Sequence, residues 1–326
     1  MKAVVLSGAG GVEVLKILER PDPAFGPEEV RVRVRASALN RADLLQRRGL
    51  YPAPPGAPPD IPGLEFAGEV EACGDRVEKL RAGDRVMGIV AGGAHAEKLV
   101  LHERACIPIP ANLSWEDAAA IPEAFLTAFD ALVLQASLAA GETVLVPAAA
   151  SGVGTAAVQI ASLCGATAIG LSRSPDKRAR LEALGCSHVF DPASLDPAAI
   201  LAATGARGVD VILELVGAAS WALDMAVLAE RGRIVLVGTM GGSVAQVDLG
   251  ILMRKRATVV GTVLRSRGLE EKIFLAREFA RRMVAPFEAG RLRSVVDRVL
   301  PLAEIAAAHE ALEKGEAFGK IVLRVP

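Results

Sequence analysis

The residues best suited to chemistry in this chain follow two apolar runs near its middle. The first run (144–146) leads into a turn of small residues (148–154) and then into a helical pattern. The second run ends in hydroxyls and cations: Ser172, Arg173, Ser174 and Lys177. Small residues let backbone N–H groups approach a pyrophosphate, and the following helix adds its N-terminal dipole. The stretch 143–177 is therefore typical of a βαβ unit that holds a dinucleotide.

The turn departs from the strict dinucleotide fingerprint. Its frame has Ala149, Ser151 and Gly154 where three glycines are usual. Small residues still permit close backbone approach, and Gly154 would let the helix pack against the strand. The predicted cofactor contacts here are Ala150, Ser151, Gly152 and Val153. The alternative is a strand-to-helix turn that serves tight packing alone.

The end of the second strand favours a phosphorylated cofactor. An Asp or Glu there would bind a ribose 2′-hydroxyl, but the position holds Ser172. Hydroxyl donors and positive charge at Ser172, Arg173, Ser174 and Lys177 suit a 2′-phosphate. We therefore predict NADPH in preference to NADH. The alternative is a solvated polar turn in which Asp176 pairs locally.

Length and composition predict a soluble enzyme. The 326 residues suffice for two domains, and a net charge of −1 gives no electrostatic support for general nucleic-acid or anionic-membrane binding. The most apolar stretch (118–140) is interrupted by Pro122, Glu123 and Asp130, so none reaches the roughly 20 residues that span a bilayer. The N-terminus has the pattern of two strands around a Gly turn and not of a signal peptide. Four scattered cysteines indicate reduced thiols in a cytoplasmic protein.

Residues 1–122 are rich in strand patterns. Val and Arg alternate over 29–39, which is typical of a half-exposed antiparallel strand. A short helix over 40–48 and a Pro-rich loop over 51–62 come next. Further strands are predicted at 64–73, 83–89 and 94–101. Together these segments predict a compact β-barrel domain.

Residues 123–265 alternate between strand and helix patterns. Strands are predicted at 143–148, 166–171, 186–190, 209–216, 233–238 and 257–264. Short, dense apolar runs of this kind indicate a doubly wound parallel sheet. The remaining residues predict helices over 269–283 and 302–314, followed by two closing strands. A final strand that returned to the N-terminal barrel would make that domain discontinuous.

Seven segments carry a resemblance to a known family. They read ALNRADLLQRRGLYPAPPGAP, IPGLEFAGEV, IPEAFLTAFDAL, AAASGVGTAAVQIA, RIVLVGTMGG, TVLRSRG and FGKIVLRV. In order and spacing the chain resembles the medium-chain dehydrogenase/reductase family, most closely its zinc-free quinone oxidoreductase (zeta-crystallin-like) branch. The resemblance covers essentially the whole chain. It implies an α/β fold with a GroES-like β-barrel catalytic domain (1–122 and 266–326) and a Rossmann NADP-binding domain (123–265).

Neither zinc site of the family is expected. Relatives with a catalytic zinc carry a Cys near the position of Asn40, and Gly-His-Glu where this chain has Gly63, Leu64 and Glu65. An amide or a leucine cannot replace a thiolate or an imidazole in a tetrahedral site. The structural-zinc lobe of such relatives has four closely spaced cysteines, whereas the region after residue 101 has only Cys106. The histidines show no ligand spacing, so we predict no metal ligand among them.

Hydride delivery to an electrophilic acceptor is the chemistry that suits a metal-free member of this family. Alcohols and simple ketones need a Lewis acid, whereas quinones and α,β-unsaturated carbonyls do not. We predict an NADPH-dependent quinone reductase, a homodimer acting on a small molecule in the cytoplasm. The alternatives are an enoyl or alkenal reductase, and an NADPH-binding structural or regulatory protein with little turnover. The working mechanism has NADPH bound first in a cleft between the domains, and a proton supplied by water or a nearby hydroxyl.

Asn40 and Tyr51 are the predicted catalytic residues. In the resembling enzymes, the Asn that replaces the zinc-ligand Cys lies near the nicotinamide; the alternative for Asn40 is a helix cap for residues 41–48. Tyr51, the only tyrosine, matches a tyrosine that lines the substrate cleft and could orient or protonate an oxygen. Its alternative is packing against the prolines of its own loop. Leu45 replaces a second cleft tyrosine of some relatives.

The resemblance implies further cofactor contacts along the chain. They are Asn40, Thr127, Val216, Gly217, Gly238, Met240, Gly241, Val263, Leu264, Arg265 and Lys320. The alternative for the Gly and Val residues is strand-end geometry and core packing. Pro192 replaces an adenine-side Tyr of some close relatives. The apolar edge strand over 257–264 is predicted to pair with its twin in a homodimer.

Overall fold

The computed structural model describes residues 1–326, the whole chain. The chain divides into two compact units, one formed by Met1–Leu126 with Leu264–Pro326 and the other by Thr127–Val263. We call them the discontinuous unit and the central unit. These limits lie close to the domain limits expected from the sequence at 122 and 265, and the first falls inside helix α3 (Pro122–Phe129).

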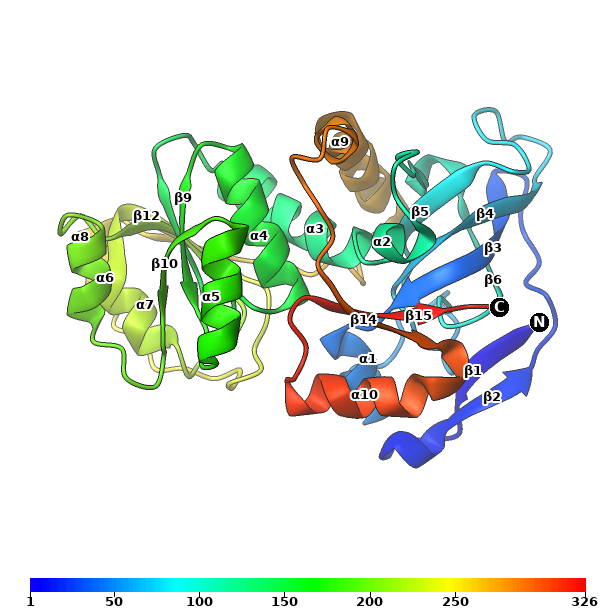
Figure 1. Ribbon diagram of the computed structural model, residues 1–326, viewed down its shortest axis with the longest axis horizontal. Helices are drawn as coiled ribbons and strands as arrows, with labels where there is room; N and C mark the ends of the chain where they lie inside the picture. Colours follow the sequence, from blue (N-terminus) through cyan, green and yellow to red (C-terminus); the bar gives the residue numbers. More distant parts are fainter. The chain divides into compact units, whose positions relative to one another are not determined.

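The discontinuous unit is built on a sheet of seven strands. The strand order is β14-β15-β3-β4-β5-β7, with β6 paired to β3, and β1 and β2 form a separate two-stranded sheet (Figure 1). The strands are β1 (Lys2–Leu6), β2 (Leu15–Glu19), β3 (Glu29–Ala38), β4 (Glu65–Cys73), β5 (Arg85–Ile89), β6 (Lys98–His102), β7 (Ile107–Pro108), β14 (Val296–Pro301) and β15 (Lys320–Arg324). The helices are η1 (Val12–Val14), α1 (Arg41–Arg47), η2 (Glu103–Ala105), α2 (Trp115–Ala119), α9 (Leu269–Glu288), η4 (Leu302–Glu304) and α10 (Ile305–Lys314).

The alternating pattern of β3 explains its place in the sheet. Val30, Val32 and Val34 are fully buried on one face. On the other face, Nε of Arg31 donates to the Glu71 carboxylate at 2.7 Å. The strand pairs antiparallel with both β4 and β6, which confirms the predicted half-exposed antiparallel strand.

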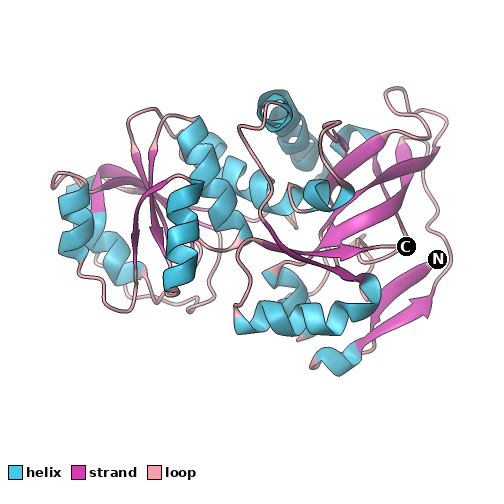
Figure 2. Ribbon diagram, viewed as in Figure 1, coloured by secondary structure: helices cyan, strands magenta, loops and turns pink.

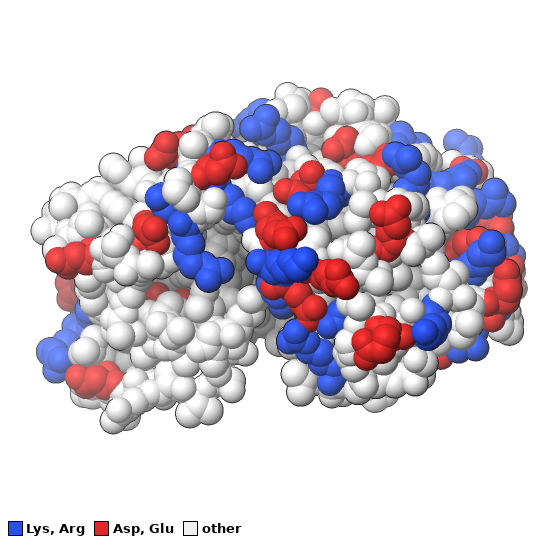
Figure 3. All heavy atoms as spheres, turned by 60° about the horizontal axis from the view of Figure 1, so that its bottom comes forward, with Lys and Arg blue, Asp and Glu red and all other residues white.

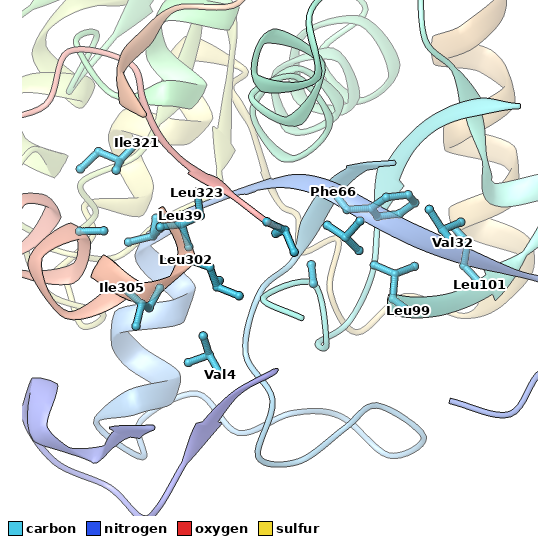
Figure 4. Packing of buried hydrophobic residues seen from close by; sticks show 14 of the residues in the cluster. Val4, Val32, Leu39, Phe66, Leu99, Leu101, Leu302, Ile305, Ile321 and Leu323 are labelled. Atoms are coloured by element: carbon cyan, nitrogen blue, oxygen red, sulfur yellow. The ribbon is translucent and has the colours of Figure 1, made fainter. Parts of the chain in front are cut away.

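One hydrophobic core joins both ends of the chain in this unit. Figure 4 shows Val32, Phe66 and Leu99 gathered along β3, while Leu302 and Ile305 come from the C-terminal segment. Burial of each large side chain contributes about 1.5–3 kcal/mol to folding. The C-terminal segment therefore completes the core that the N-terminal strands begin.

The order of the C-terminal elements differs from the prediction. Two strands were expected after the helix over 302–314, but β14 lies before α10 and only β15 follows it. β14 pairs with β15 in parallel, and β15 pairs antiparallel with β3, with Val322 opposite Ala38. Parallel neighbours need a crossover between them, and α10 supplies it.

The central unit is a six-stranded sheet in the order β10-β9-β8-β11-β12-β13. All five strand pairs are parallel, and helices lie on both sides of the sheet (Figure 2). The strands are β8 (Thr143–Val146), β9 (Thr167–Leu171), β10 (Cys186–Phe190), β11 (Val209–Glu214), β12 (Leu228–Leu236) and β13 (Thr258–Gly261). The helical segments after α3 are η3 (Asp130–Gln135), α4 (Gly152–Leu163), α5 (Pro175–Leu184), α6 (Pro197–Ala203), α7 (Trp221–Val227) and α8 (Leu249–Lys255). The predicted doubly wound parallel sheet is confirmed.

Burial explains the dense apolar runs in the central strands. Leu145 of β8 and Ile212 of β11 are fully buried, since helices cover both faces of the sheet. The charged side chains visible in Figure 3 mix the two signs, as the net charge of −1 suggests. None of the helices combines the length and apolar character needed to cross a bilayer.

Candidate functional site

The turn after β8 is shaped by close packing. Ser151 caps α4, its Oγ accepting a hydrogen bond from the Gly154 N–H at 3.1 Å. A Cβ on Gly154 would lie 2.5 Å from the carbonyl oxygen of Ala149. Only glycine fits this close approach of helix to turn, and the packing interpretation of Gly154 therefore holds.

The same turn has the features of a phosphate site. The first N–H groups of α4, at Gly152 and Val153, have no acceptor inside the helix. Ser151 is exposed, and Ala150, Gly152 and Val153 are partly exposed. A 12-residue helix places its positive end at this turn. The structure thus brings the four predicted contacts together at one accessible helix start, where an anion fits.

The polar turn after β9 combines structural and accessible groups. Ser172 is only 7% exposed, whereas Arg173 is exposed. Oγ of Ser174 accepts from the Lys177 N–H at 3.4 Å and caps α5. Ser174 therefore has a structural task that the phosphate interpretation did not include.

Arg178 organises this turn and was not among the predicted residues. Its Nη1 donates to the carbonyl oxygens of Ser172 at 3.0 Å and Arg173 at 2.9 Å, and to the Asp191 carboxylate at 3.2 Å. An Arg placed four residues after the cap Ser174 lies one helical turn along α5 and can fold back over the turn. The four-residue spacing between Ser174 and Arg178 is the sequence feature that could have predicted this role.

The ends of β11 and β12 bring four predicted residues together. The N–H of Gly241 donates to the Val216 carbonyl at 2.7 Å. A Cβ on Gly217 would lie 2.6 Å from the Gly242 carbonyl, and one on Gly238 would lie 2.7 Å from that of Leu215. These glycines are required by loop packing at the carboxyl end of the sheet, which is also where open α/β sheets bind ligands.

A pocket of about 340 Å³ adjoins these loops. Its lining residues include Gly217, Ala218, Trp221, Thr239 and Val259. Met240 is 61% exposed beside them.

Glu214 holds the loop after β11, and like Arg178 it was not among the predicted residues. Its carboxylate is fully buried and accepts from the N–H groups of Val216 and Gly217 and from Oγ of Ser220. Asp224 is fully buried beside Glu214. Burial, and then the neighbouring Glu214 charge, raise the pKa of Asp224 to about 9. Asp224 therefore carries a proton at neutral pH.

The other predicted cofactor contacts of the central unit are Thr127 and Val263, its first and last residues. Thr127 is buried in α3, and Val263 is 51% exposed just after β13. Leu264 and Arg265 belong to the discontinuous unit.

Asn40 joins the start of α1 to a buried polar group in the discontinuous unit. It is the cap residue of α1, and its N–H donates to the Asp43 carboxylate at 2.8 Å. Its Nδ2 donates to Glu65 Oε1 at 2.8 Å, and its Oδ1 accepts from Lys320 Nζ at 2.5 Å. Asn40 serves the helix start and this polar group together.

Lys320 is a buried cation with all three N–H groups engaged. Nζ donates to the Leu39 carbonyl at 2.6 Å and to Asn40, and it pairs with Glu65 Oε1 at 2.7 Å. The side chain is 6% exposed and that of Glu65 is fully buried. An ammonium has three donors, so a cofactor contact from Lys320 would have to replace one of these bonds.

Arg265, which follows β13 in the chain, contacts the loop that carries Tyr51. Its Nη1 donates to the Tyr51 carbonyl at 3.1 Å, its Nη2 to Gln46 Oε1 at 2.6 Å and its Nε to the Ala91 carbonyl at 2.8 Å. The guanidinium also lies over the Tyr51 ring. Burial raises the pKa of the Tyr51 phenol, against the opposing charge of Arg265. The structure thus gives Arg265 a role in holding the predicted catalytic tyrosine.

Glu123 completes what we call the polar cluster. Its N–H donates to Glu65 Oε2 at 2.8 Å. The members of the polar cluster are Asn40, Tyr51, Glu65, Glu123, Arg265 and Lys320. No group of three or more His, Cys, Asp or Glu side chains in the structure could hold a metal ion. The predicted lack of zinc sites stays a prediction.

Both halves of the fold match known families. Residues 26–111 match the alcohol dehydrogenase GroES-like domain, and residues 152–280 match a family described as zinc-binding dehydrogenase. The chain is 35% identical to the quinone oxidoreductase of Lama guanicoe, covering 99% of this chain and 97% of that one. It is likewise 35% identical to the quinone oxidoreductase of Pseudomonas aeruginosa, covering 99% of each chain. The mouse synaptic vesicle membrane protein VAT-1 homolog is 30% identical over 99% of this chain and 83% of its own length.

Solved structures agree with this assignment. The quinone oxidoreductase of Pseudomonas syringae superposes with a TM-score of 0.89 at 34% identity, covering 99% of each chain. The Escherichia coli quinone oxidoreductase, solved in complex with NADPH, superposes with a TM-score of 0.87 at 29% identity, covering 99% of this chain and all of that one. The chain therefore belongs to the quinone oxidoreductase (zeta-crystallin-like) branch of the medium-chain dehydrogenase/reductase family.

Proposed function

We propose that this protein is an NADPH-dependent quinone reductase that works without zinc. The observation that carries the proposal is the turn after β9, where Ser172 and exposed Arg173 stand in place of a carboxylate. A carboxylate there would favour the unphosphorylated cofactor, and cations favour the 2′-phosphate. Relatives that match this chain over nearly their full length are named quinone oxidoreductases. The structure of the Escherichia coli quinone oxidoreductase was solved in complex with NADPH.

The central unit fits this cofactor. Added side chains at Gly154, Gly217 and Gly238 would strike the backbone, so glycine at these positions keeps the loops closely packed at the carboxyl end of the sheet. The start of α4 would bind the pyrophosphate, and Arg173 the 2′-phosphate. Arg178 would hold that turn in place. The remaining contacts expected from the family stay part of the proposal.

Bound NADPH supplies the hydride, and the residues of the discontinuous unit orient the acceptor and manage its proton. Tyr51 would direct its phenol toward the acceptor oxygen. Arg265 holds the Tyr51 carbonyl by one hydrogen bond and is itself fixed by two more, to Gln46 and Ala91. Lys320 and Asn40 hold Glu65, which in turn binds the start of α3.

Zinc independence rests on Leu64 and on residues of the polar cluster. Asn40 and Leu64 stand where relatives with catalytic zinc carry Cys and His. Lys320 already places a positive charge 2.7 Å from Glu65. A divalent cation beside Glu65 would have to displace this ammonium.

We also propose a homodimer formed through the edge strand β13. Val259 of β13 (37%) and Val263 just after it (51%) are exposed, and so are three apolar side chains of the preceding segment: Val244 88%, Leu249 68% and Met253 77%. An apolar sheet edge of this kind is normally covered by another chain. The four cysteines are free thiols, as suits the reducing cytoplasm.

The test is steady-state oxidation of NADPH and NADH with ortho-quinones, para-quinones and 2-alkenals. We expect quinone reduction with NADPH preferred, and unchanged turnover after treatment with a zinc chelator. Preference for NADH, or for alkenals, would overturn the proposal. Tight NADPH binding without oxidation by any acceptor would favour a binding protein.

A further inference from the structure

Two carboxyl groups of the polar cluster lie in contrasting surroundings. Glu65 is fully buried and accepts from the Asn40 amide at 2.8 Å and from the Glu123 N–H at 2.8 Å. It also pairs with the Lys320 ammonium at 2.7 Å. All three contacts favour the charged form of a carboxyl group. Both oxygens of the Glu65 carboxyl group therefore have polar partners.

The carboxyl group of Glu123 has no such hydrogen bonds or ion pair. Glu123 is partly buried near the start of α3, directly after Pro122, and no hydrogen bond or ion pair of the structure reaches its carboxyl group. Its backbone ties it to the negative Glu65. Two neighbouring carboxyl groups in a poorly solvated place resist sharing two negative charges. The surroundings of Glu123 therefore favour its protonated form.

The other titratable and charged groups that act on Glu123 or respond to it come from several elements. They are Asp43 of α1, Tyr51 of the following loop, Glu65 of β4, Arg265 after β13, Lys272 of α9 and Lys320 of β15. Burial and then Glu65 raise the pKa of Glu123 to about 8, and Lys320 and Arg265 oppose the shift. At neutral pH the group is therefore an acid with a proton to give.

We propose that Glu123 is the catalytic acid that protonates the reduced acceptor, beside the phenol of Tyr51. This assignment rests on the proposed quinone reductase activity. Glu123 and Tyr51 lie close enough for the charge of one to act on the other. An acid whose proton affinity matches the working pH transfers its proton more effectively than a phenol of ordinary acidity.

The proton and electron balance is simple. Hydride brings two electrons and one proton to the quinone, which becomes a hydroquinone monoanion, while the dihydronicotinamide is oxidised. The O–H bond of Glu123 breaks as a new O–H bond forms on the hydroquinone oxygen. The remaining Glu123 carboxylate takes a proton from water before the next turnover.

Turnover should depend on pH because only the protonated form of Glu123 can donate a proton to the acceptor. Turnover is expected to be constant below neutral pH and to fall as pH rises through about 8, where Glu123 loses its proton. The variant Glu123→Gln has no such acid, so its pH profile should lack the fall of turnover at alkaline pH, which we call the alkaline limb. Glu123→Asp, which keeps the acid on a shorter stem, should retain the limb with reduced turnover.

The decisive experiment compares Glu123→Gln with the wild type across a series of quinones. We expect kcat to fall by about 100-fold for quinones that give weakly acidic hydroquinones, with NADPH affinity unchanged. The loss should shrink for electron-poor quinones, because their hydroquinone anions need no proton donor. Glu270→Gln, an exposed change on α9, is the matched control and should behave as wild type.

Clear outcomes separate this inference from the proposed function. A wild type that reduces no quinone contradicts the proposed function itself. A wild type that reduces quinones while Glu123→Gln keeps its kcat and alkaline limb overturns only the role of Glu123. If Glu123→Gln does not fold, carboxyl titration by NMR in the wild type decides the question: a Glu123 pKa below about 6 would sink the proposal, since such a group is ionised at neutral pH.

Discussion

The guanidinium of Arg265 lies over the ring of Tyr51, 4.9 Å from the ring centroid, while its Nη1 donates to the carbonyl of the same residue at 3.1 Å. One cation thus fixes both the ring and the backbone of the predicted catalytic tyrosine. A cation–π contact of this kind contributes about 0.5–2 kcal/mol, and each charged hydrogen bond about 1.5–3 kcal/mol.

Replacing Arg265 should disturb the acceptor more than the cofactor. Arg265→Leu removes the donors to Gln46, Tyr51 and Ala91, so we expect about 3 kcal/mol less stability and a higher KM for quinones. Affinity for NADPH should stay the same. Urea unfolding and a cofactor titration measure the two effects. Arg265→Lys should recover part of the stability, and an equal loss of NADPH affinity would instead support the cofactor contact expected from the family.

Cofactor choice should depend on the turn after β9. Arg173→Ala removes an exposed cation, and we expect the preference for NADPH over NADH to fall about tenfold, which is about 1.4 kcal/mol. Arg178→Ala should weaken binding of both cofactors, because it frees the backbone of Ser172 and Arg173. The ratio of kcat/KM values gives the result. Arg207→Ala, an exposed change at the opposite end of β11, should leave the ratio unaltered.

Removing Lys320 should leave a buried charge without its partner. We expect Lys320→Met to cost about 3–5 kcal/mol, because Glu65 is fully buried. The double variant Lys320→Met with Glu65→Gln should regain much of this stability. A double-mutant cycle in urea measures the coupling, and a coupling energy near zero would mean that the pair does not hold the polar cluster.

Asp224 should make stability depend on pH. Its pKa is raised to about 9, so the folded state keeps a proton that the unfolded chain releases near pH 4. Stability is then greatest below pH 4 and is lost progressively as pH rises toward 9, by up to about 1.4 kcal/mol per pH unit. Asp224→Asn should flatten this slope. Urea unfolding at pH 6 and pH 8.5 checks it, and equal slopes in both proteins would contradict the assignment.

Local patterns in the sequence predicted most of the fold. Alternation over 29–39 identified β3 because a strand with one buried face needs an apolar residue at every second position. The small-residue turn before α4 and the polar end of β9 are local patterns too, and they predicted a cofactor site in the central unit. The place of β14 was predicted wrongly, because a short strand that pairs in parallel gains its support from a distant partner, β15.

The sequence by itself determined most of the elements, the family and the residue types at the predicted cofactor turns, since each depends on neighbours within a few positions. Only the tertiary structure decided which charged groups meet. Arg265 and Tyr51 are 214 residues apart, and Lys320 lies 280 residues from Asn40. Whether a carboxyl group keeps its proton depends on burial and on such distant partners, and no local pattern carries that information.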